Sequence, residues 1–349
     1  MGPRPVRIGI VGAGKNTCEK HIPRLQSIPG VEVVSVCNRT RQSSERVAAQ
    51  FKIPNVYNHW QALVRAPEAD AIVIGAWPYL HCPVTVAALS HGKHVLCEAR
   101  MAMNLEEARV MLAAAQAKPR LVAQLVPAPF TLGIDPTIRH LEDQGFLGKP
   151  LALEVRSSPG AFLEPTAPMH WRQDKALSGL NVMTLGIWYE TVMRWFGEAR
   201  RVTAAGRIFV ERRRDAEHRA TRAVEIPDHL DVIAEMACGA QAHFQMSAVA
   251  GLTPVNEALI WGAEGTLVVR DGKLFGGRRG DSQLAELPRT PDIGDGWKVE
   301  AEFIDALRGA GQVERTTFED GVRYMEFTEA VWRSMEKGRA VDLPLQARK

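Results

Sequence analysis

The fold is decided by the stretch Val6-Arg7-Ile8-Gly9-Ile10-Val11-Gly12-Ala13-Gly14-Lys15-Asn16-Thr17. Its first six residues are rich in β-branched side chains and predict a buried strand, and Gly12 and Gly14 predict a tight turn into a helix. Such a turn directs backbone N–H groups and the positive end of the helix dipole toward a pyrophosphate, which a side chain at Gly12 or Gly14 would block. The stretch therefore predicts a dinucleotide-binding turn, although Thr17 stands at the third motif position, where Gly or Ala is usual.

A second strand is predicted at Val31–Cys37, and Asn38 follows it, 21 residues after Thr17. This spacing matches the distance of about 20 residues between the glycine turn and the residue that meets the adenosine ribose. An acidic residue there would favour NAD(H), whereas Asn38, Arg39 and Thr40 offer donors and a positive charge. We therefore expect NADP(H) to be favoured, with NAD(H) possible. Lys15 and Asn16 are expected beside the same cofactor, and the alternative is that Asn38 to Thr40 form only a polar loop.

Composition indicates a two-domain protein in a reducing compartment. The chain has 349 residues, of which 46% are hydrophobic and 24% charged, with a net charge of +3. The basic clusters Arg212-Arg213-Arg214 and Arg278-Arg279 have no interleaved aromatic residues and are expected in solvated loops, so no nucleic-acid partner is predicted. The five cysteines show no CxxC spacing, which speaks against a disulfide framework or a metal site. Without an apolar run of membrane-spanning length, the protein is expected in the cytoplasm.

Strand and helix patterns alternate along the first third of the chain, which is typical of a doubly wound parallel α/β sheet, the Rossmann class. Pro127 and Pro129 then break the pattern. We expect an NAD(P)-binding domain over residues 1–126 and a substrate and oligomerisation domain over residues 127–349. The predicted elements of the first domain after Cys37 are helices near 43–51, 81–91 and 104–118, the last capped by Asn104, and strands at 70–74, 94–97 and 121–126.

The second domain is predicted to be α+β, with a large, mostly antiparallel open sheet. Alternating patterns occur at residues 151–156, 202–210, 231–236, 240–248, 257–261 and 266–269, and helical patterns at 135–144, 299–308 and 320–337. One face of an antiparallel sheet can stay uncovered and become a subunit interface. A homodimer or homotetramer through this sheet is therefore expected.

Four motifs together resemble the Gfo/Idh/MocA oxidoreductase family over almost the whole chain. They are His94-Val95-Leu96-Cys97-Glu98, Trp171-Arg172 ahead of Leu185-Gly186-Ile187, Gly262-Ala263-Glu264-Gly265-Thr266, and Phe318-Glu319-Asp320-Gly321. The resemblance implies NAD(P) binding in the first domain and oxidation or reduction of sugars, inositols or related polyols at the second, in dimers or tetramers.

The resemblance also implies positions for cofactor contacts. A loop with Ala76, Trp77, Pro78 and His81 would pass over the cofactor, and of these His81 is expected to orient the following helix rather than to react. Glu98 would hold the nicotinamide ribose, and Trp171 and Arg172 would approach the nicotinamide. His21 matches a histidine that the family often has in its first helix and is expected to be structural.

The chain departs from the family at its usual catalytic positions. Glu98-Ala99-Arg100 stands where members have Glu-Lys-Pro, and Ala99 cannot replace the lysine. Arg100 does not deprotonate in a protein, so it can hold a substrate oxyanion but not act as a base. Thr184-Leu185-Gly186-Ile187-Trp188 stands where members have Asp-x-Gly-x-His, and neither titratable side chain is present.

His170 and Tyr189 are the candidate replacements for the missing acid/base, His170 first because imidazole titrates near neutral pH. The alternative for His170 is a loop residue near the cleft. Arg100, Thr184, Trp188 and Glu190 are candidate substrate contacts, with core packing as the alternative for Trp188. Three functions remain open. The first is an NADP(H)-favouring oxidoreductase that transfers hydride to or from a sugar-like, polyol or cyclic ketone or alcohol substrate; the others are a redox-neutral lyase or glycosidase that uses bound NAD(P), and a non-catalytic cofactor-binding protein.

Overall fold

The computed structural model describes residues 4–215, 219–289, 296–313 and 315–346. The chain divides into two compact units: unit 1 combines Met1–Pro127 with Lys298–Met325, and unit 2 combines Ala128–Trp297 with Glu326–Lys349. The predicted boundary places Lys298–Met325 in the second domain, whereas the contacts of this segment belong to the first unit. As a functional division, the boundary at residue 126 stays a prediction.

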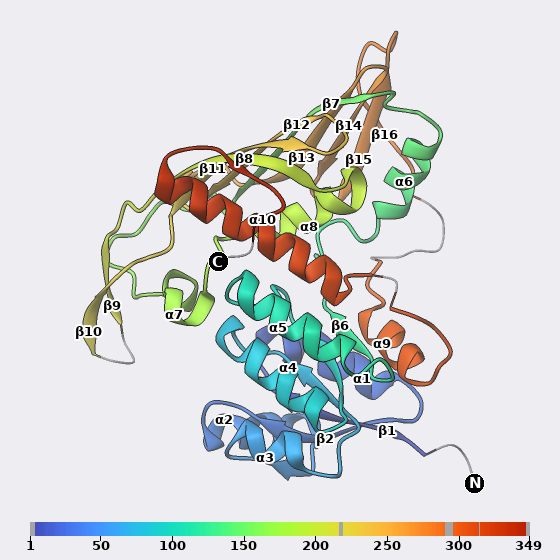
Figure 1. Cartoon of the computed structure of the whole chain (residues 1–349), viewed down its shortest axis with the longest axis vertical. Helices are drawn as coiled ribbons and strands as arrows, with labels where there is room; N and C mark the ends of the chain where they lie inside the picture. The colour runs from blue at the N-terminus through green and yellow to red at the C-terminus, as the bar shows by residue number, and fades with distance from the viewer. Residues whose placement is uncertain (1–3, 216–218, 290–295, 314, 347–349) are drawn as a thin grey trace. The chain divides into compact units, whose positions relative to one another are not determined.

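Unit 1 is built on a six-stranded sheet whose neighbouring strands are all parallel, in the order β3-β2-β1-β4-β5-β6 (Figure 1). The predicted doubly wound class is confirmed. The strand order reverses between β1 and β4, and in such sheets ligands bind beyond the carboxyl ends of the strands at that reversal. The strands are β1 (Val6–Val11), β2 (Val31–Cys37), β3 (Asn55–Val56), β4 (Ala71–Ile74), β5 (His94–Cys97) and β6 (Ala123–Leu125).

Helices connect these strands and bury their apolar sides against the sheet. Asn104 caps α5 as predicted, because its side chain accepts a hydrogen bond from the Glu107 amide at 2.9 Å. Two short elements, α3 and β3, are absent from the sequence prediction. The helices of unit 1 are η1 (Thr17–His21, a π-helical turn), α1 (Ile22–Ser27), α2 (Arg41–Phe51), α3 (Trp60–Arg65), η2 (Pro78–Leu80), α4 (His81–Ser90), α5 (Leu105–Gln116), α9 (Val299–Leu307) and the first part of α10 (Phe318–Lys337).

Unit 2 is built on a nine-stranded sheet in the order β16-β15-β14-β13-β7-β12-β11-β8-β17. All neighbouring pairs are antiparallel except β12 and β7, so the predicted mostly antiparallel sheet is confirmed. The strands are β7 (Pro150–Ser158), β8 (Ala199–Arg207), β11 (His229–Met236), β12 (Gln241–Ser247), β13 (Val255–Gly262), β14 (Gly265–Arg270), β15 (Lys273–Arg278), β16 (Ala285–Glu286) and β17 (Val341–Asp342).

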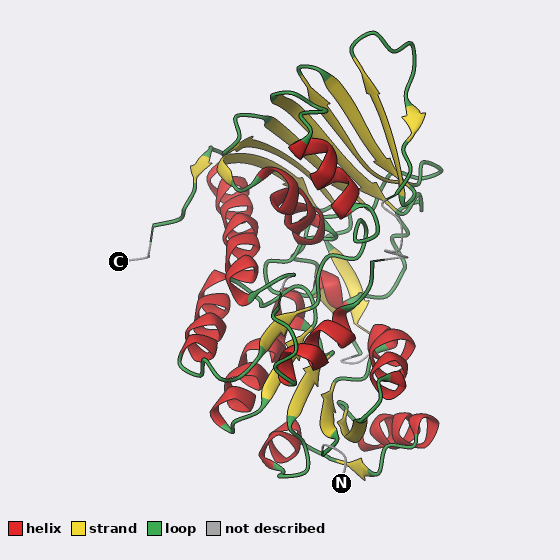
Figure 2. Ribbon diagram, turned by 90° about the vertical axis from the view of Figure 1, so that its right-hand side faces the viewer, coloured by secondary structure: helices red, strands yellow, loops and turns green. Residues whose placement is uncertain are grey.

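The two faces of this sheet differ. On β11, Leu230, Val232 and Ala234 are buried, whereas Ile233 between them is 39% exposed. Within the described ranges, helices lie against one face only, and no helix covers the opposite face (Figure 2). The helices of unit 2 are α6 (Asp135–Asp143), η3 (Trp171–Gln173), α7 (Lys175–Ser178), α8 (Leu185–Phe196) and the second part of α10.

The cluster Arg212-Arg213-Arg214 is not a solvated loop, so that expectation was wrong. These residues begin β9 (Arg212–Asp215), which pairs with β10 (Ala220–Ala223). Arg213 is buried, and its Nη1 donates to the carbonyl oxygens of Glu164 at 2.7 Å and Ala167 at 3.0 Å. These two carbonyl oxygens, rather than water, accept the hydrogen bonds of the Arg213 guanidinium.

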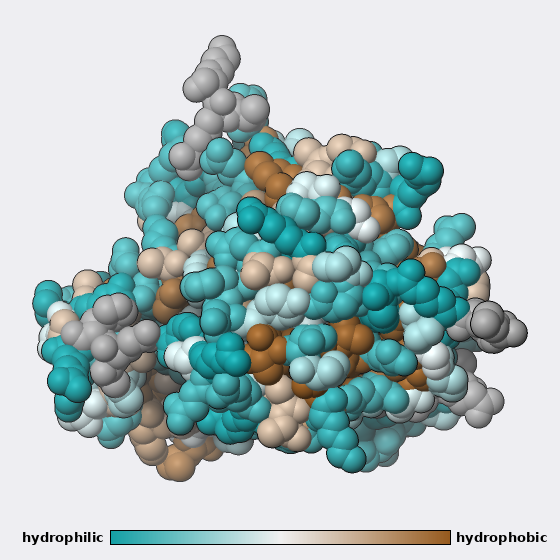
Figure 3. Space-filling view, turned by 90° about the horizontal axis from the view of Figure 1, so that it is seen from below, coloured by the Kyte–Doolittle hydropathy of each residue, from teal (hydrophilic) through white to brown (hydrophobic). Residues whose placement is uncertain are grey.

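None of the helices in the described ranges is both long enough and apolar enough to cross a bilayer. Hydrophilic side chains cover most of the face drawn in Figure 3, and apolar side chains occur there in small groups.

Candidate active site

The glycine turn after β1 has the geometry that its sequence predicts. Gly12 has a φ of +85°, and a Cβ there would lie 2.4 Å from the amide nitrogen of Ala76, so only glycine fits. At Gly14 a Cβ would meet only the Gly75 carbonyl oxygen, at 3.7 Å, which is an ordinary contact. The protein itself therefore leaves the space above Gly14 open, which is where a pyrophosphate would approach the backbone.

Thr17 at the third motif position is accommodated by Gly75. Thr17 is buried, and its hydroxyl lies 3.3 Å from the Gly12 carbonyl oxygen. A Cβ at Gly75 would lie 2.0 Å from the Thr17 hydroxyl. Because Gly75 has no side chain, the loop after β4 can pass close to Thr17. A glycine at position 17 would allow the same close packing.

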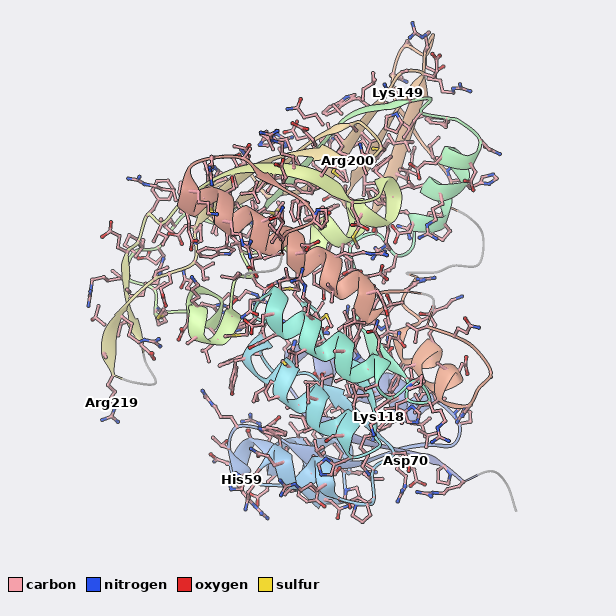
Figure 4. The ribbon with its side chains drawn as sticks, in the orientation of Figure 1. His59, Asp70, Lys118, Lys149, Arg200 and Arg219 are labelled. Carbon is pink, nitrogen blue, oxygen red and sulfur yellow. The ribbon has the colours of Figure 1, made fainter. Side chains whose placement is uncertain are left out.

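A hollow of about 580 Å³ lies at the C-terminal edge of the unit 1 sheet. In the described part of the chain no carboxylate lines it, whereas the guanidinium-bearing residues Arg39 and Arg46 do. Figure 4 labels His59, which lines the hollow, and Asp70, which lies at the opposite edge, where it binds Arg7. The remaining lining includes Val11–Gly14, Cys37, Asn38, Ser43, Asn58, Trp60, Gln61, Gly75–Trp77, Tyr79 and Leu80.

Asn38 ties the glycine turn to the start of α2. Its Oδ1 accepts from the Ala13 amide at 2.6 Å, and its Nδ2 donates to the Ser43 carbonyl at 3.3 Å. Thr40 is the N-cap of α2 and accepts from the Ser43 amide at 3.2 Å. Both residues therefore shape the rim of the hollow, while the Arg39 guanidinium lies 5.7 Å from the centre of the Trp77 ring. Lys15 points to solvent beside Glu19.

The residues Asn16, His21, Glu98 and Glu300 form a polar cluster, called here the His21 cluster, next to the glycine turn. His21 is fully buried, and its ring nitrogens lie 2.9 Å from Glu98 Oε1 and 2.6 Å from Glu300 Oε1. Asn16 Nδ2 donates to Glu98 as well. Burial alone would lower the pKa of His21, but hydrogen bonds to Glu300 and Glu98 outweigh it and raise the pKa to about 9. His21 is thus a buried imidazolium between two carboxylates, in the structural role expected for it.

Glu98 follows the last residue of β5 and remains partly exposed, at 16%. Burial tends to raise the pKa of its carboxyl, but His21 and Asn16 lower it to below the ordinary value. Oε2 accepts from the Ala99 amide at 3.1 Å, so both oxygens are held in place. Glu98 is therefore an oriented carboxylate at the carboxyl end of the sheet.

The loop after β4 is held by His81. Its Nε2 lies 2.9 Å from the Ala76 carbonyl, and its Nδ1 lies 2.9 Å from the Arg100 carbonyl. Burial lowers the pKa of His81, although the Ala76 and Arg100 carbonyl oxygens favour the charged ring. The ring connects the two loops at the edge of the sheet. Trp77 precedes Pro78, which starts η2, and Arg100 is buried, with 4% exposed.

In unit 2, His170 is an exposed residue that caps η3. Its Nδ1 accepts from the Arg172 amide at 3.2 Å, and its own amide donates to the Gln173 side chain. Partial desolvation and the charge of Arg172 lower the pKa of His170. With Nδ1 occupied as an acceptor, the neutral ring carries its proton on Nε2. The guanidinium of Arg172 lies 4.3 Å from the centre of the Trp171 ring.

Helix α8 buries three of the predicted site residues. Tyr189 stacks on Phe327 with ring centroids 3.6 Å apart, and its hydroxyl accepts from the Ala199 amide, so it lies in the core. Glu190 is buried and pairs with Arg194 at 2.7 Å. Trp188 is buried too, whereas Thr184, just before the helix, is half-buried. The packing of Tyr189 removes it from the candidates for proton transfer, and that of Glu190 removes it from the candidate substrate contacts.

Comparisons with known proteins agree with this geometry. Residues 6–125 match the family model described as "Oxidoreductase family, NAD-binding Rossmann fold", and residues 136–268 match the "GFO/IDH/MocA C-terminal domain". The chain belongs to the GFO/IDH/MocA oxidoreductase family. The nicotinamide dinucleotide site of this family therefore lies in unit 1.

Relatives within the GFO/IDH/MocA family are distant. "Glucose-fructose oxidoreductase domain-containing protein 2" of Xenopus laevis is 25% identical over 95% of this chain and 92% of the relative. "Inositol 2-dehydrogenase" of Pseudomonas fluorescens is 28% identical over 54% of each protein. Among solved structures, levoglucosan dehydrogenase in complex with NADH and L-sorbose aligns with a TM-score of 0.85 at 19% identity, over 98% of this chain and 99% of that one, which shows a shared fold.

Two polar residues of this GFO/IDH/MocA chain, Glu300 of the His21 cluster and Asn256 on β13, are absent from the sequence predictions. Glu300 shares the buried side of α9 with Phe303 and Ile304, at spacings of three and four residues. Asn256 alternates with the buried Ala258 and Ile260 on β13. In both cases, a polar residue at an otherwise apolar position of the pattern indicates a buried polar contact. The sequence does not reveal which residue makes that contact, because the partner is distant in the chain.

Proposed function

We propose that this chain is an oxidoreductase that transfers hydride between NADP(H) and a small sugar-like, polyol or cyclic ketone or alcohol substrate. The observation that carries the proposal is the hollow at the sheet edge, which combines the open backbone at Gly14 with two arginines and no carboxylate in the described chain. The names of an inositol dehydrogenase relative and of a levoglucosan dehydrogenase neighbour support the substrate class.

The residues of unit 1 fit a dinucleotide with a 2′-phosphate. The missing side chain at Gly14 leaves room for the pyrophosphate at the turn, and Arg39 and Arg46 offer guanidinium groups to the phosphate on the ribose. Glu98, oriented by the His21 cluster, would accept from the nicotinamide ribose hydroxyls. When bound, the nicotinamide supplies or accepts the hydride. Lys15, Asn16, Asn38, Thr40, Ala76, Trp77, Pro78, His81, Trp171 and Arg172 remain predicted contacts.

The proton path of the proposed reaction is not the usual one for the family, because Ala99 and Trp188 replace the lysine and histidine. His170 remains the candidate. While its Nδ1 caps η3, neutral His170 can donate from Nε2 but cannot accept there, so action as a base requires the cap to open. Arg100 and Thr184 remain candidate substrate contacts.

The proposal includes the expected quaternary structure and location. A homodimer or homotetramer would form through the uncovered face of the nine-stranded sheet, where Ile233 is exposed. The five free cysteines fit the reducing conditions of the cytoplasm.

Fluorescence titration with NADPH and NADH tests the cofactor preference. NADPH is expected to bind at least about tenfold more tightly than NADH, and Arg39→Ala together with Arg46→Ala is expected to remove most of that difference. Asn38→Asp should shift the preference toward NADH, because a carboxylate repels a 2′-phosphate. Equal affinity of the wild type for both cofactors would refute the NADP(H) preference.

Turnover of sugars and polyols, followed by absorbance of the reduced cofactor, tests the reaction. His170→Ala should lower kcat by about 10²-fold if His170 moves the proton. Tight cofactor binding with no turnover of any substrate would favour the redox-neutral or the non-catalytic alternative.

A further inference from the structure

The first turn of α8 holds Trp188 against Asn256 on β13. Trp188 is 1% exposed, and its ring centroid lies 5.3 Å from that of Phe130. Its Nε1 donates to Asn256 Oδ1 at 3.0 Å. The indole is therefore fixed both by packing and by a hydrogen bond.

Asn256 receives a second hydrogen bond from Ser157. The two residues face each other across β7 and β13, and Ser157 Oγ donates to Asn256 Oδ1 at 3.2 Å. Thr184 Oγ1 donates in turn to Ser157 Oγ at 3.0 Å. Ser157, Thr184, Trp188 and Asn256, called here the Asn256 cluster, form one hydrogen-bonded chain within unit 2.

Trp188 decides which way the Asn256 amide faces. An indole N–H can only donate, so the oxygen of the carboxamide must face it, and the nitrogen must lie on the other side. Asn256 Nδ2 has no hydrogen-bond partner among the residues that the structure describes, and the side chain is half-buried rather than enclosed. Two N–H donors of fixed direction are therefore open at the surface of unit 2.

The Asn256 cluster is uncharged. Arg156 and Glu257, the chain neighbours of Ser157 and Asn256, lie on the opposite face of the sheet, where they bind each other. The cluster holds neither a cation for a phosphate or carboxylate nor a group that titrates near neutral pH. It can offer hydrogen bonds to a neutral ligand.

We propose that Asn256 is a substrate-binding residue whose Nδ2 donates to a carbonyl oxygen of a neutral, polyhydroxylated substrate, and that Trp188 and Ser157 are positioning residues that hold its Oδ1. This inference rests on the proposed function and names the recognition element of its substrate site. The oxygen of the Asn256 amide is occupied, so only its two Nδ2 hydrogens are available to a ligand. A carbonyl oxygen, which only accepts hydrogen bonds, is a suitable partner for them.

The variant Asn256→Asp tests the donor role. Its carboxylate can still accept from Trp188 and Ser157, but the outward atom becomes an acceptor. The probes are two carbonyl and alcohol pairs, 2-keto-myo-inositol with myo-inositol and D-glucono-1,5-lactone with D-glucose. Calorimetry measures binding of the carbonyls to protein loaded with NADP+ and of the alcohols to protein loaded with NADPH, so that no probe can react. Asn256→Asp should weaken binding of the carbonyl member by about tenfold and of the alcohol, which can donate to a carboxylate, by less than about threefold.

Trp188→Phe tests the positioning role, because it removes the indole N–H and leaves a ring in place. Carbonyl binding should weaken by about three- to tenfold, with a raised KM and little change in kcat. Trp195→Phe is the matched control, since Trp195 lies on the same helix and its Nε1 binds Asp135 at 2.9 Å, away from the cluster. That control should lower Tm without changing carbonyl binding.

Three outcomes would overturn the inference: wild type that binds no carbonyl probe, equal losses for both members of a pair in Asn256→Asp, and equal effects of Trp188→Phe and Trp195→Phe on binding. Binding is measured without turnover here. A wild type that binds these probes but transfers no hydride would instead refute the proposed function and leave this inference standing.

Discussion

At the scale of single residues, the two glycines of the turn after β1 have different roles, Gly12 in stability and Gly14 in cofactor binding. Gly12→Ala places a Cβ against the Ala76 backbone at a positive φ and should cost about 2–4 kcal/mol of stability together with cofactor binding. Gly14→Ala meets no such clash, so Tm should stay nearly constant while NADPH affinity falls at least about tenfold. Thermal unfolding and cofactor titration of both variants check this. Equal losses of Tm in the two variants would contradict it.

His21 makes stability depend on pH in the alkaline direction. Its pKa is about 9 in the folded protein against 6.5 as the ordinary value, so its contribution is fully present below about pH 6.5 and is lost as the pH rises through 9. That shift corresponds to roughly 3 kcal/mol in the free energy of unfolding. Denaturant unfolding from about pH 6 to about pH 10 should show this decline in the wild type and a flatter profile in His21→Gln. A parallel decline in both proteins would speak against a charged His21.

The glycine turn could be predicted from the sequence, whereas the His21 cluster beside it could not, because only the turn is formed by residues close together in the chain. Gly12 and Gly14 lie in the turn after β1 and Asn38 directly follows β2, so their spacing is set by the chain itself. The contact between His21 and Glu300 joins segments 279 residues apart, so only the folded chain brings them together.

At the scale of secondary-structure elements, Tyr324 connects α10 to the loop between β5 and α5 within unit 1. Tyr324 is fully buried, and its hydroxyl accepts from the Met101 amide at 2.6 Å. Tyr324→Phe leaves that buried N–H without this acceptor and should cost about 1–3 kcal/mol. Chemical denaturation measures the change, and a variant as stable as the wild type would show that Met101 finds another acceptor.

Elements with clear periodicity were predicted well, and short or charged ones were not. Strand β4 is a continuous apolar run, β2 is mostly apolar, and α5 carries its own capping residue. The two-residue strand β3 and the six-residue helix α3 are too short to show a period. Strand β9 begins with three arginines, and its place is set by carbonyl groups of a distant loop that the local pattern cannot reveal.

At the scale of the whole molecule, the uncovered sheet face should hold copies of the chain together. Ile233→Lys combined with Leu259→Lys puts two charges on that face and should shift the mass measured by light scattering to that of a monomer. Leu252→Lys is the control, because Leu252 is 80% exposed and lies outside the sheet strands. A wild type that is already monomeric, or a double variant with unchanged mass, would contradict an interface through this face.

We propose that hydride transfer takes place at the site built around the glycine turn. The most direct measurement is a single-turnover reaction with NADPH deuterated at the transferable position of nicotinamide C4, across a panel of ketoses, lactones and keto-inositols, with mass spectrometry of the products. We expect oxidised cofactor and a product carrying one deuterium. Unchanged NADPH with every compound, despite tight cofactor binding, would contradict it.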